Sequence, residues 1–272
     1  MKVLALVSLL AIWIQPLYGG FDYPAYSARN AGLGNSYLAG GEIRDGFLLN
    51  PALSALSTGS YAALNYANLY GMSELQFANG IALLPYNRGS IGLAVQTLGS
   101  GIYRESQLTI NTAKAFYNRH LSIGISLHYY HVTAEGYAQT ASWGLDAGFR
   151  YRIQDRLYIA GTLSNINQPG LYGHAEEIPQ IAEAGVAYVP LPEISAYLAV
   201  RKDSWHAPEI SLGASCRIYE QLEILSGYSS ASAMPSLGIV LDAFGVEASY
   251  AVQHHFDLGP THYIGLAFHP RS

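Results

Sequence analysis

Four polar residues on two neighbouring runs are the strongest candidates for chemistry in this sequence. His128 and Tyr130 share the polar side of one alternating run, and Asp146 and Arg150 share the polar side of the next. A histidine beside a carboxylate can accept and return a proton. No nucleophile motif accompanies them, and their neighbours on the same side are mostly glycine and serine. We therefore interpret the four as a polar cluster inside a lumen rather than as a catalytic acid and base.

Two further patterns could carry chemistry but lack the spacing that it needs. His254, His255 and His262 could meet across the last loop, yet adjacent strand residues point to opposite sides and no carboxylate spacing supports a metal. The glycine-rich stretch 32–41 follows no strand and opens no helix of useful length, unlike a dinucleotide-binding loop. The sequence thus predicts no enzyme, no cofactor and no metal site.

The composition of the chain points to a membrane. Of the 272 residues, 50% are hydrophobic and only 12% are charged, about half the charge of a soluble domain. No stretch after Gly20 reaches the roughly 18 apolar residues of a membrane-spanning helix. A closed β-barrel is the other structure that can span a bilayer, because its strands satisfy every backbone group.

The single Cys216 and a net charge of −5 without a basic cluster predict neither disulfides nor a nucleic-acid partner.

The first twenty residues have the pattern of a secretory signal peptide. Lys2 precedes the short apolar run from Val3 to Ile14, and Pro16 ends that run before Gly20. A run of this length is too short for a membrane anchor. We expect three parts in the chain: a signal peptide (1–20), an amino-terminal plug segment (21–56) and an outer-membrane barrel (57–272).

From Ser60 onward, runs with a period of two are separated by turn residues. In the run 121–130 the odd-numbered residues are apolar up to Tyr129, whereas the even-numbered ones are Ser, Gly, His and Tyr. Such alternation is typical of a strand with one apolar and one polar face. Fourteen such runs can be counted, and short connections alternate with longer ones, as in outer-membrane barrels. We expect external loops at Gly99 to Ser106 and, the longest, at Ile166 to Pro179.

Tyrosines near the ends of these runs fit the interfaces of a membrane, where a phenol can reach water while its ring stays in lipid. We expect such belts to include the following residues: Tyr61, Tyr66, Tyr70, Tyr129, Tyr130, Tyr151, Tyr158, Tyr188, Tyr228 and Tyr263. A soluble, lipocalin-like barrel or a sandwich would alternate as well. Fourteen strands enclose more space than their own side chains fill, however, because about eight already make a packed interior.

The stretch from Phe21 to Leu56 is the one long part of the exported chain without strand alternation. A wall of fourteen strands needs either an open channel or a plug, and this stretch is about the right size for the plug. Gly92, Gly124, Gly144, Gly148 and Gly213 lie on the polar sides of the runs, where small residues suit a close-packed plug.

Two short motifs in this stretch resemble the amino-terminal signature of the PorV/PorQ proteins, which are relatives of the FadL-type outer-membrane transporters. Members of that family tend to have A-R-x-x-x-L-G followed by N-P-A-G-L. Here the first motif runs from Ala28 and Arg29 to Gly34, and the second begins at Asn50 and Pro51. The chain has N-P-A-L-S here, so it departs from the second motif at Leu53 and Ser54. Residues 258–266 resemble the closing strand of the same family.

The resemblance implies an all-β, transmembrane antiparallel barrel of about fourteen strands in the outer membrane, with an internal amino-terminal segment. PorV-like members act in type IX secretion beside a large translocon, and PorQ-like members accompany a cell-surface sortase complex. The leading hypothesis is therefore a non-enzymatic accessory or cargo-handling component of protein export, with translocon or surface-complex proteins and membrane lipid as partners. The alternatives are a FadL-like transporter of small hydrophobic molecules and a structural barrel that binds partners through its loops.

Overall fold

The structure is a computed structural model that describes residues 20–23, 25–40, 46–87, 89–137, 139–172 and 176–270. Apart from Gly20, the expected signal peptide lies outside the described residues. Among the residues described, no helix is both long enough and apolar enough to span a bilayer.

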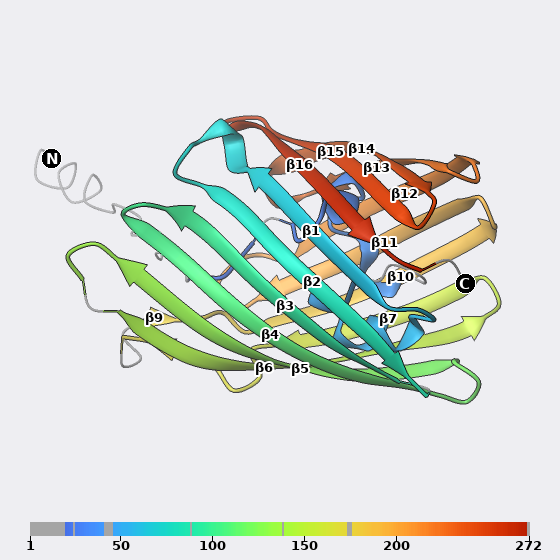
Figure 1. The fold of residues 1–272 in the computed structure, drawn as a ribbon, viewed down its shortest axis with the longest axis horizontal. Coiled ribbons are helices and arrows are strands. Elements are labelled where there is room, and N and C mark those ends of the chain that lie inside the picture. Colours follow the sequence, from blue (N-terminus) through green and yellow to red (C-terminus); the bar gives the residue numbers. More distant parts are fainter. Residues whose placement is uncertain are drawn as a thin grey trace, which may run out of the picture.

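Fourteen antiparallel strands close into a barrel, and the first strand pairs with the last (Figure 1). This confirms the expected fold class and strand number. Around the wall each strand lies beside its neighbour in the sequence, and two short strands, β8 and β9, form a separate hairpin between β7 and β10. The strands of the barrel are β1 (Tyr61–Asn68), β2 (Gln76–Tyr86), β3 (Gly89–Ser100), β4 (Tyr103–Phe116), β5 (Leu121–Ala134), β6 (Thr140–Gln154), β7 (Leu157–Ser164), β10 (Ile181–Leu191), β11 (Ile194–Asp203), β12 (Glu209–Tyr219), β13 (Leu222–Ser229), β14 (Met234–Ala243), β15 (Val246–His255) and β16 (Gly259–Phe268).

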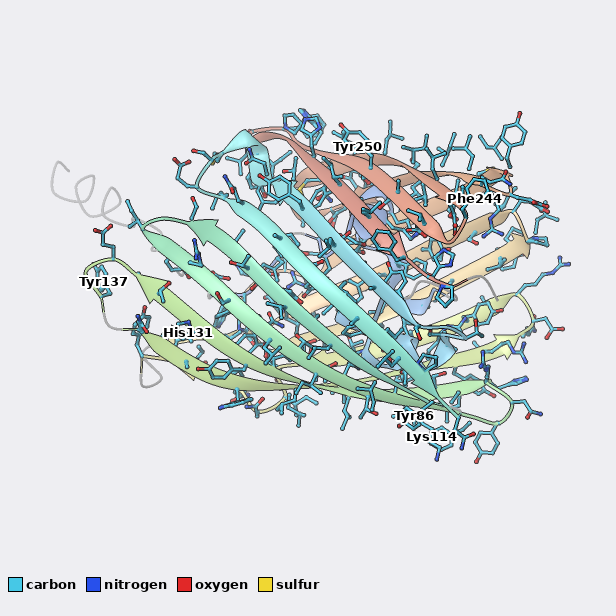
Figure 2. The ribbon with its side chains drawn as sticks, viewed as in Figure 1. Tyr86, Lys114, His131, Tyr137, Phe244 and Tyr250 are labelled. Atoms are coloured by element: carbon cyan, nitrogen blue, oxygen red, sulfur yellow. The ribbon has the colours of Figure 1, made fainter. Side chains whose placement is uncertain are left out.

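Side chains alternate between the lumen and the outside, as the period of two predicts. In β5, Ser122 and Ser126 are 1% exposed, whereas Ile123 and Ile125 are 46% and 50% exposed. Figure 2 shows side chains projecting outward all around the wall, with Tyr137 near the long-loop rim. The apolar outer surface is what a wall in contact with lipid requires.

Several tyrosines expected in the membrane belts instead point into the lumen. Tyr61, Tyr130 and Tyr263 are only 7%, 4% and 2% exposed, whereas Tyr66 and Tyr151 lie on the outer surface as expected. The prediction for the first three was wrong because nearness to a strand end says nothing about the side. The alternation decides the side, and these three occupy lumen-facing positions.

The long-loop end is more compact than the sequence indicates. A loop was expected at Gly99 to Ser106, but β3 and β4 extend to Ser100 and Tyr103 and leave only residues 101–102 between them. The extension was hidden because Glu105, a charged residue, continues the alternation on the lumen side, where it is buried. The longest connection does lie between β7 and β10, as expected, and it contains β8 (Gly170–Leu171) and β9 (Glu176–Glu177).

The amino-terminal residues 20–40 and 46–56, excluding residue 24, form an internal segment inside the barrel (blue in Figure 1). It contains a short helix, α1 (Ala28–Gly32), and three 3₁₀ turns, η1 (Tyr37–Ala39), η2 (Gly46–Leu48) and η3 (Pro51–Leu56). Helix α1 packs against β13 to β16, η1 against β7, β10 and β11, and η3 against β3 to β6. The internal segment therefore contacts most of the circumference of the wall. Two further 3₁₀ turns, η4 (Leu69–Gly71) and η5 (Ala231–Ala233), lie in external connections.

Local sequence explains why the internal segment forms these turns. Ser27 accepts a hydrogen bond from the backbone N–H of Asn30 and so caps α1. Asn50 caps η3 in the same way through the N–H of Ala52, and Pro51 occupies the first position of that turn, where no N–H is needed.

Candidate functional site

Arg29 joins the internal segment to two strands of the wall. Its guanidinium lies 2.5 Å from Glu223 on β13 and 3.1 Å from Glu247 on β15. Burial by itself would lower the pKa of Arg29, but the carboxylates of Glu247 and Glu223 raise it, and the pKa lies well above its usual range. The arginine of the first motif is therefore a charged anchor, because each of its two carboxylates belongs to a different strand.

Gly34 allows the chain to pass close against the wall. Its φ of +62° lies in the left-handed region that glycine adopts without strain. A side chain there would also meet the backbone nitrogen of Tyr228 at 2.5 Å. Ala28, at the start of the same motif, is 1% exposed on α1. In the first motif, Ala28 is a buried small residue, Arg29 is the charged anchor, and Gly34 lets the backbone pass close to the wall.

The second motif lies against the opposite side of the lumen, on β5 and β6. The Asn50 amide donates to the carbonyl oxygens of Leu38 at 3.1 Å and Phe149 at 3.0 Å, and its oxygen accepts from Ala52. Glycines make room for this contact. A Cβ on Gly148 would lie 2.3 Å from Asn50 Oδ1, and one on Gly124 would lie 2.3 Å from the Pro51 carbonyl oxygen.

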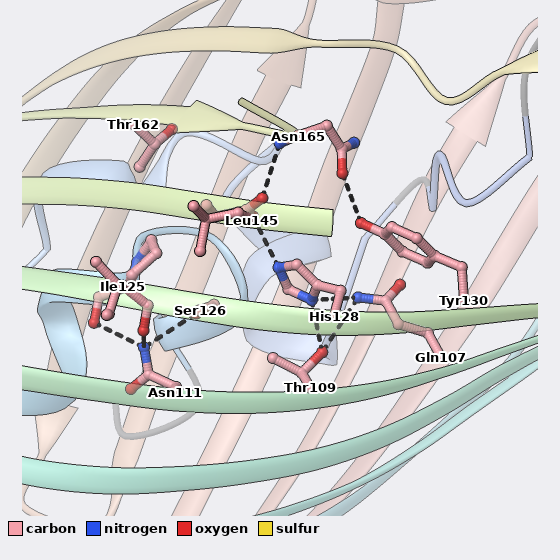
Figure 3. Close-up of polar contacts among 12 residues, drawn as sticks. Gln107, Thr109, Asn111, Ile125, Ser126, His128, Tyr130, Leu145, Thr162 and Asn165 are labelled. Carbon is pink, nitrogen blue, oxygen red and sulfur yellow. Dashed lines mark hydrogen bonds and ion pairs between the residues drawn. The ribbon is translucent and has the colours of Figure 1, made fainter. Parts of the chain in front are cut away.

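Ser54, one of the two positions at which the chain departs from the second motif, makes a polar contact with the wall. Its hydroxyl donates to Asn111 Oδ1 on β4 at 2.6 Å. The Asn111 amide nitrogen in turn approaches Pro51 O and Ile125 O, both at 3.1 Å, and Ser126 Oγ at 3.0 Å (Figure 3). The departure at Ser54 therefore adds a hydrogen bond to the wall.

Three of the four residues in the predicted polar cluster lie together near the long-loop end. His128 Nε2 lies 3.0 Å from Asp146 Oδ2, and the Tyr130 ring stacks on the His128 ring with centroids 5.7 Å apart. His128 Nδ1 lies 2.8 Å from the amide nitrogen of Gln107 and 2.9 Å from Thr109 Oγ1 (Figure 3). Because an amide nitrogen only donates, Nδ1 is the acceptor and the ring proton is placed on Nε2, toward Asp146.

Arg150 lies apart from this cluster. Its Nε donates to Ala39 O at 3.1 Å, and its guanidinium carbon lies 4.0 Å from the centre of the Tyr158 ring. Asp146 and Arg150 share a face of β6, but four residues of a strand separate them by roughly 13 Å. Arg150 therefore contacts the internal segment rather than His128.

The cluster has the partners of a general base but no accessible nucleophile. Thr109, the hydroxyl nearest His128, is 0% exposed. Among the residues described, no group of three or more histidine, cysteine, aspartate or glutamate side chains could hold a metal ion. A structural role for His128 is the simplest account, because its contacts join β4, β5 and β6.

A cavity of about 460 Å³, the upper cavity, opens at the long-loop end of the lumen. Its aromatic lining comes from both the internal segment and the strands, including Phe21, Tyr23, Tyr26 and Tyr130. A second cavity of about 440 Å³, the lower cavity, opens at the short-turn end around Arg29. The two cavities share no lining residue.

Besides His128 Nε2, which faces Asp146, three buried groups that line the upper cavity have no hydrogen-bond partner among the described residues. They are the Tyr23 hydroxyl, the Asn30 side-chain oxygen and both amide atoms of Gln96, on residues that are 5%, 3% and 0% exposed. Buried polar groups usually have partners. Like Thr109, these atoms are closed to water, so a molecule in the cavity reaches them only after neighbouring side chains move. Sequence reasoning missed them because nothing in their local pattern separates them from other lumen-facing residues.

Charges at the mouth of this cavity are mainly negative. Arg201 on β11 lies 2.8 Å from Asp22, 3.5 Å from Glu183 and 3.6 Å from Glu209. One cation therefore faces three carboxylates. The sequence alone could not reveal this set, because its members come from the internal segment and from three different strands.

The wall is continuous through most of its strand pairs. Among the described pairs, β3 joins both of its neighbours without a register shift, and the three irregularities lie at the short-turn ends of other pairs. Beyond Asp146, however, β6 has no ladder partner on the side of β7. The connection after β7 covers this edge: Ile166 N donates to Leu145 O, and the Asn167 side chain bonds Leu145 N at 2.9 Å and Trp143 O at 2.7 Å.

These features define a FadL-like outer-membrane β-barrel fold. The chain is similar to the toluene transporter TodX of Pseudomonas putida, with a TM-score of 0.68 and 9% identity over 91% of this chain and 97% of that one. It is similar to the toluene transporter TbuX of Ralstonia pickettii, with a TM-score of 0.67 and 9% identity over 92% and 99% of the two chains. A FadL homologue of Pseudomonas aeruginosa gives 0.63 and 12% identity over 91% and 96%.

At these identities the likeness establishes the fold. No protein-family model matches the chain, and no curated protein matches its sequence. The neighbours named above are transporters or a transporter homologue of outer-membrane type. The finer resemblance to PorV/PorQ proteins rests on the two amino-terminal motifs and the closing strand.

Proposed function

We propose that this protein is a non-enzymatic outer-membrane conduit that admits small, largely apolar molecules at the long-loop end of its lumen. The observation that carries the proposal is the upper cavity, which combines aromatic rings with the unpartnered groups of Tyr23, Asn30 and Gln96. The lining contains polar side chains, such as Gln107 and His128, as well as aromatic ones, so it suits an aromatic molecule that carries a hydrogen-bonding group. The fold shared with two toluene transporters supports the same proposal.

The charges at the mouth limit the class of molecule. Asp22, Glu183 and Glu209 outnumber Arg201 and raise the cost of bringing an anion past them. We therefore expect neutral or cationic aromatic molecules with one hydrogen-bonding group to bind more tightly than carboxylates of the same size.

A matched series of ligands tests this proposal. Benzyl alcohol, benzylamine and benzoate carry the same ring with a neutral, a positive and a negative group. Calorimetric titration of the purified barrel in detergent should detect binding of the alcohol and the amine, with benzoate at least about tenfold weaker, which corresponds to about 1.4 kcal/mol. Equal binding of all three, or of none, would contradict the proposal.

A matched pair of variants locates the binding site. Ala231 lines the upper cavity, whereas Ala248 is exposed on the outer face of β15. Ala231→Trp should fill the mouth and abolish binding of benzyl alcohol, and Ala248→Trp should leave it unchanged. Loss of binding in both variants would place the ligand elsewhere.

The route out of the lumen is the second part of the proposal. The internal segment lies between the upper and lower cavities, and we propose that it acts as a plug. The β6 edge beyond Asp146, which is held by Asn167 rather than by a strand, offers a passage through the wall toward lipid.

A second candidate function is an accessory role in type IX secretion, as the PorV/PorQ resemblance implies. The continuous pairing of β3 with β2 and β4 favours it, because this part of the wall offers no opening for a ligand. Purification in mild detergent distinguishes the two functions. A secretion component should co-purify with a much larger barrel, whereas a conduit should be isolated alone and bind the aromatic series.

A further inference from the structure

Glu105 is a buried carboxylate that faces the start of the internal segment. It lies on β4, is 5% exposed, and accepts a hydrogen bond from the backbone nitrogen of Phe21 at 2.7 Å. Its other oxygen accepts from the Tyr103 hydroxyl at 2.9 Å. None of the ion pairs among the described residues includes Glu105. Burying a carboxylate without a cation is costly, so this site favours a positive charge beside Glu105.

The backbone at Phe21 has an unfavourable conformation. Its φ is +70°, which is unusual for a residue with a bulky side chain. The angle φ is defined by the peptide bond to the preceding residue, Gly20. Cleavage of that bond would therefore remove the strain. Gly20 also crowds the carboxylate, because a Cβ there would lie 2.9 Å from Glu105 Oε1.

We propose that a leader peptidase hydrolyses the bond between Gly20 and Phe21, and that the α-ammonium group so formed pairs with Glu105 inside the mouth of the barrel. Water supplies both products: Gly20 becomes a carboxylate and the nitrogen of Phe21 becomes an ammonium group, without net release of a proton. Gly20 is the small residue that such a peptidase prefers directly before the scissile bond, whereas Tyr18, two residues earlier, is not small.

The neighbouring contacts already hold the new terminus in place. The Phe21 ring lies 4.5 Å from that of Tyr130 on β5, and Asp22 pairs with Arg201 on β11 at 2.8 Å. The first two residues of the mature chain would therefore connect β4 and β5 to β11 across the mouth. Departure of Gly20 would free the space around Glu105 Oε1 for the remaining ammonium hydrogens. The inference does not depend on the transport proposal.

The first experiment identifies the terminus of the protein isolated from outer membranes. Intact mass and amino-terminal sequencing should show Phe21 as the first residue. A chain that begins at Gly20, at Asp22 or further along would overturn the proposal, because no ammonium group would then lie on the nitrogen that faces Glu105.

The second experiment measures capture of that terminus. Residues 21–272 hold only two lysines, Lys114 and Lys202, so acetylation of the α-amine is easily followed by mass spectrometry. An ion pair that raises the pKa of the amine by one unit lowers the reactive fraction about tenfold. The α-amine of the folded protein should thus react at least about tenfold more slowly than that of the urea-unfolded protein. The acetylation rate of the exposed Lys114 serves as the reference in each state. Equal corrected rates for the α-amine of the folded and of the unfolded protein would overturn the proposal.

A pair of variants separates the charge from the fold. Glu105→Gln keeps an acceptor for the Phe21 nitrogen but removes the negative charge, and should restore most of the reactivity of the amine. Glu135→Gln changes an exposed carboxylate on the connection after β5 and should leave protection as in the wild type. Unchanged protection in Glu105→Gln would overturn the proposal. If that variant does not assemble, the folded and unfolded wild-type rates decide the question.

Discussion

The side-chain amide of Asn50 donates a hydrogen bond to the carbonyl oxygen of Phe149 at 3.0 Å, across 99 residues of sequence. The same side chain also bonds Leu38 O and Ala52 N, and the residue is 0% exposed. Asn50 therefore joins two parts of the internal segment to each other and to β6.

Removing this amide should destabilise the barrel. Asn50→Ala removes two hydrogen bonds to carbonyl oxygens and one from an N–H, and a buried group that loses its partner costs about 1–3 kcal/mol. We expect the free energy of unfolding, measured by urea titration in detergent, to fall by at least about 2 kcal/mol. Gln154→Ala, at an exposed end of β6, should change it little. Equal effects of the two substitutions would contradict the assigned role of Asn50.

We expect Gly148, on the wall beside Asn50, to be required for a sealed barrel. In Gly148→Ala the new methyl group would lie 2.3 Å from Asn50 Oδ1, and the internal segment would have to move. We expect raised ion conductance in planar bilayers. Gly80→Ala places its methyl group 3.5 Å from the Leu64 side chain, an ordinary contact, and serves as the matched control. A Gly148→Ala barrel that conducts no more than the control would disprove the close approach.

Replacing Arg29 alone should lower the free energy of unfolding more than replacing Arg29 together with both of its carboxylates. Arg29→Met leaves Glu223 and Glu247 unpaired in a half-buried site, and breaking such a pair costs about 3–5 kcal/mol when burial is complete. The triple variant Arg29→Met, Glu223→Gln, Glu247→Gln should recover part of the lost free energy of unfolding. Failure of the triple variant to recover would show that packing of Arg29, rather than its charge, holds α1.

Deletion of Ala28 to Asn50 tests the proposed plug directly. Without this stretch the lumen loses α1 and η1 with their contacts to β7, β10, β11 and β13 to β16. We expect either a large rise in conductance or failure to assemble, because fourteen strands cannot fill their own interior. A barrel that assembles and stays sealed would rule out the plug.

Loosening the β6 edge should affect passage of the ligand but not binding. Asn167→Ala removes the side chain that bonds Leu145 N and Trp143 O. We expect benzyl alcohol to leave vesicles that contain the variant faster than vesicles that contain the wild type. The affinity measured by calorimetry should not change, because Asn167 does not line the upper cavity. Slower release or altered affinity would argue against an exit at this edge.

Sequence patterns predicted the candidate site only in part. The alternation put His128 and Asp146 on the polar sides of adjacent strands, and the two side chains lie 3.0 Å apart. The alternation could not show that Arg150 lies apart from them, because it indicates the side of the sheet but not which residues lie at the same level of neighbouring strands. The sequence also could not identify the partners of Arg29, because Glu223 and Glu247 are 194 and 218 residues away along the chain.

The sequence by itself determined the class of architecture. Low charge, a period of two and fourteen runs specify a lipid-facing wall, because these depend on local geometry and on the solvent around each face. The tertiary structure alone decided which groups meet inside. Closure of β1 against β16 brings Arg201, its three carboxylates and the unpartnered Gln96 around one cavity. Such contacts between distant residues depend on register and closure, for which no local pattern exists.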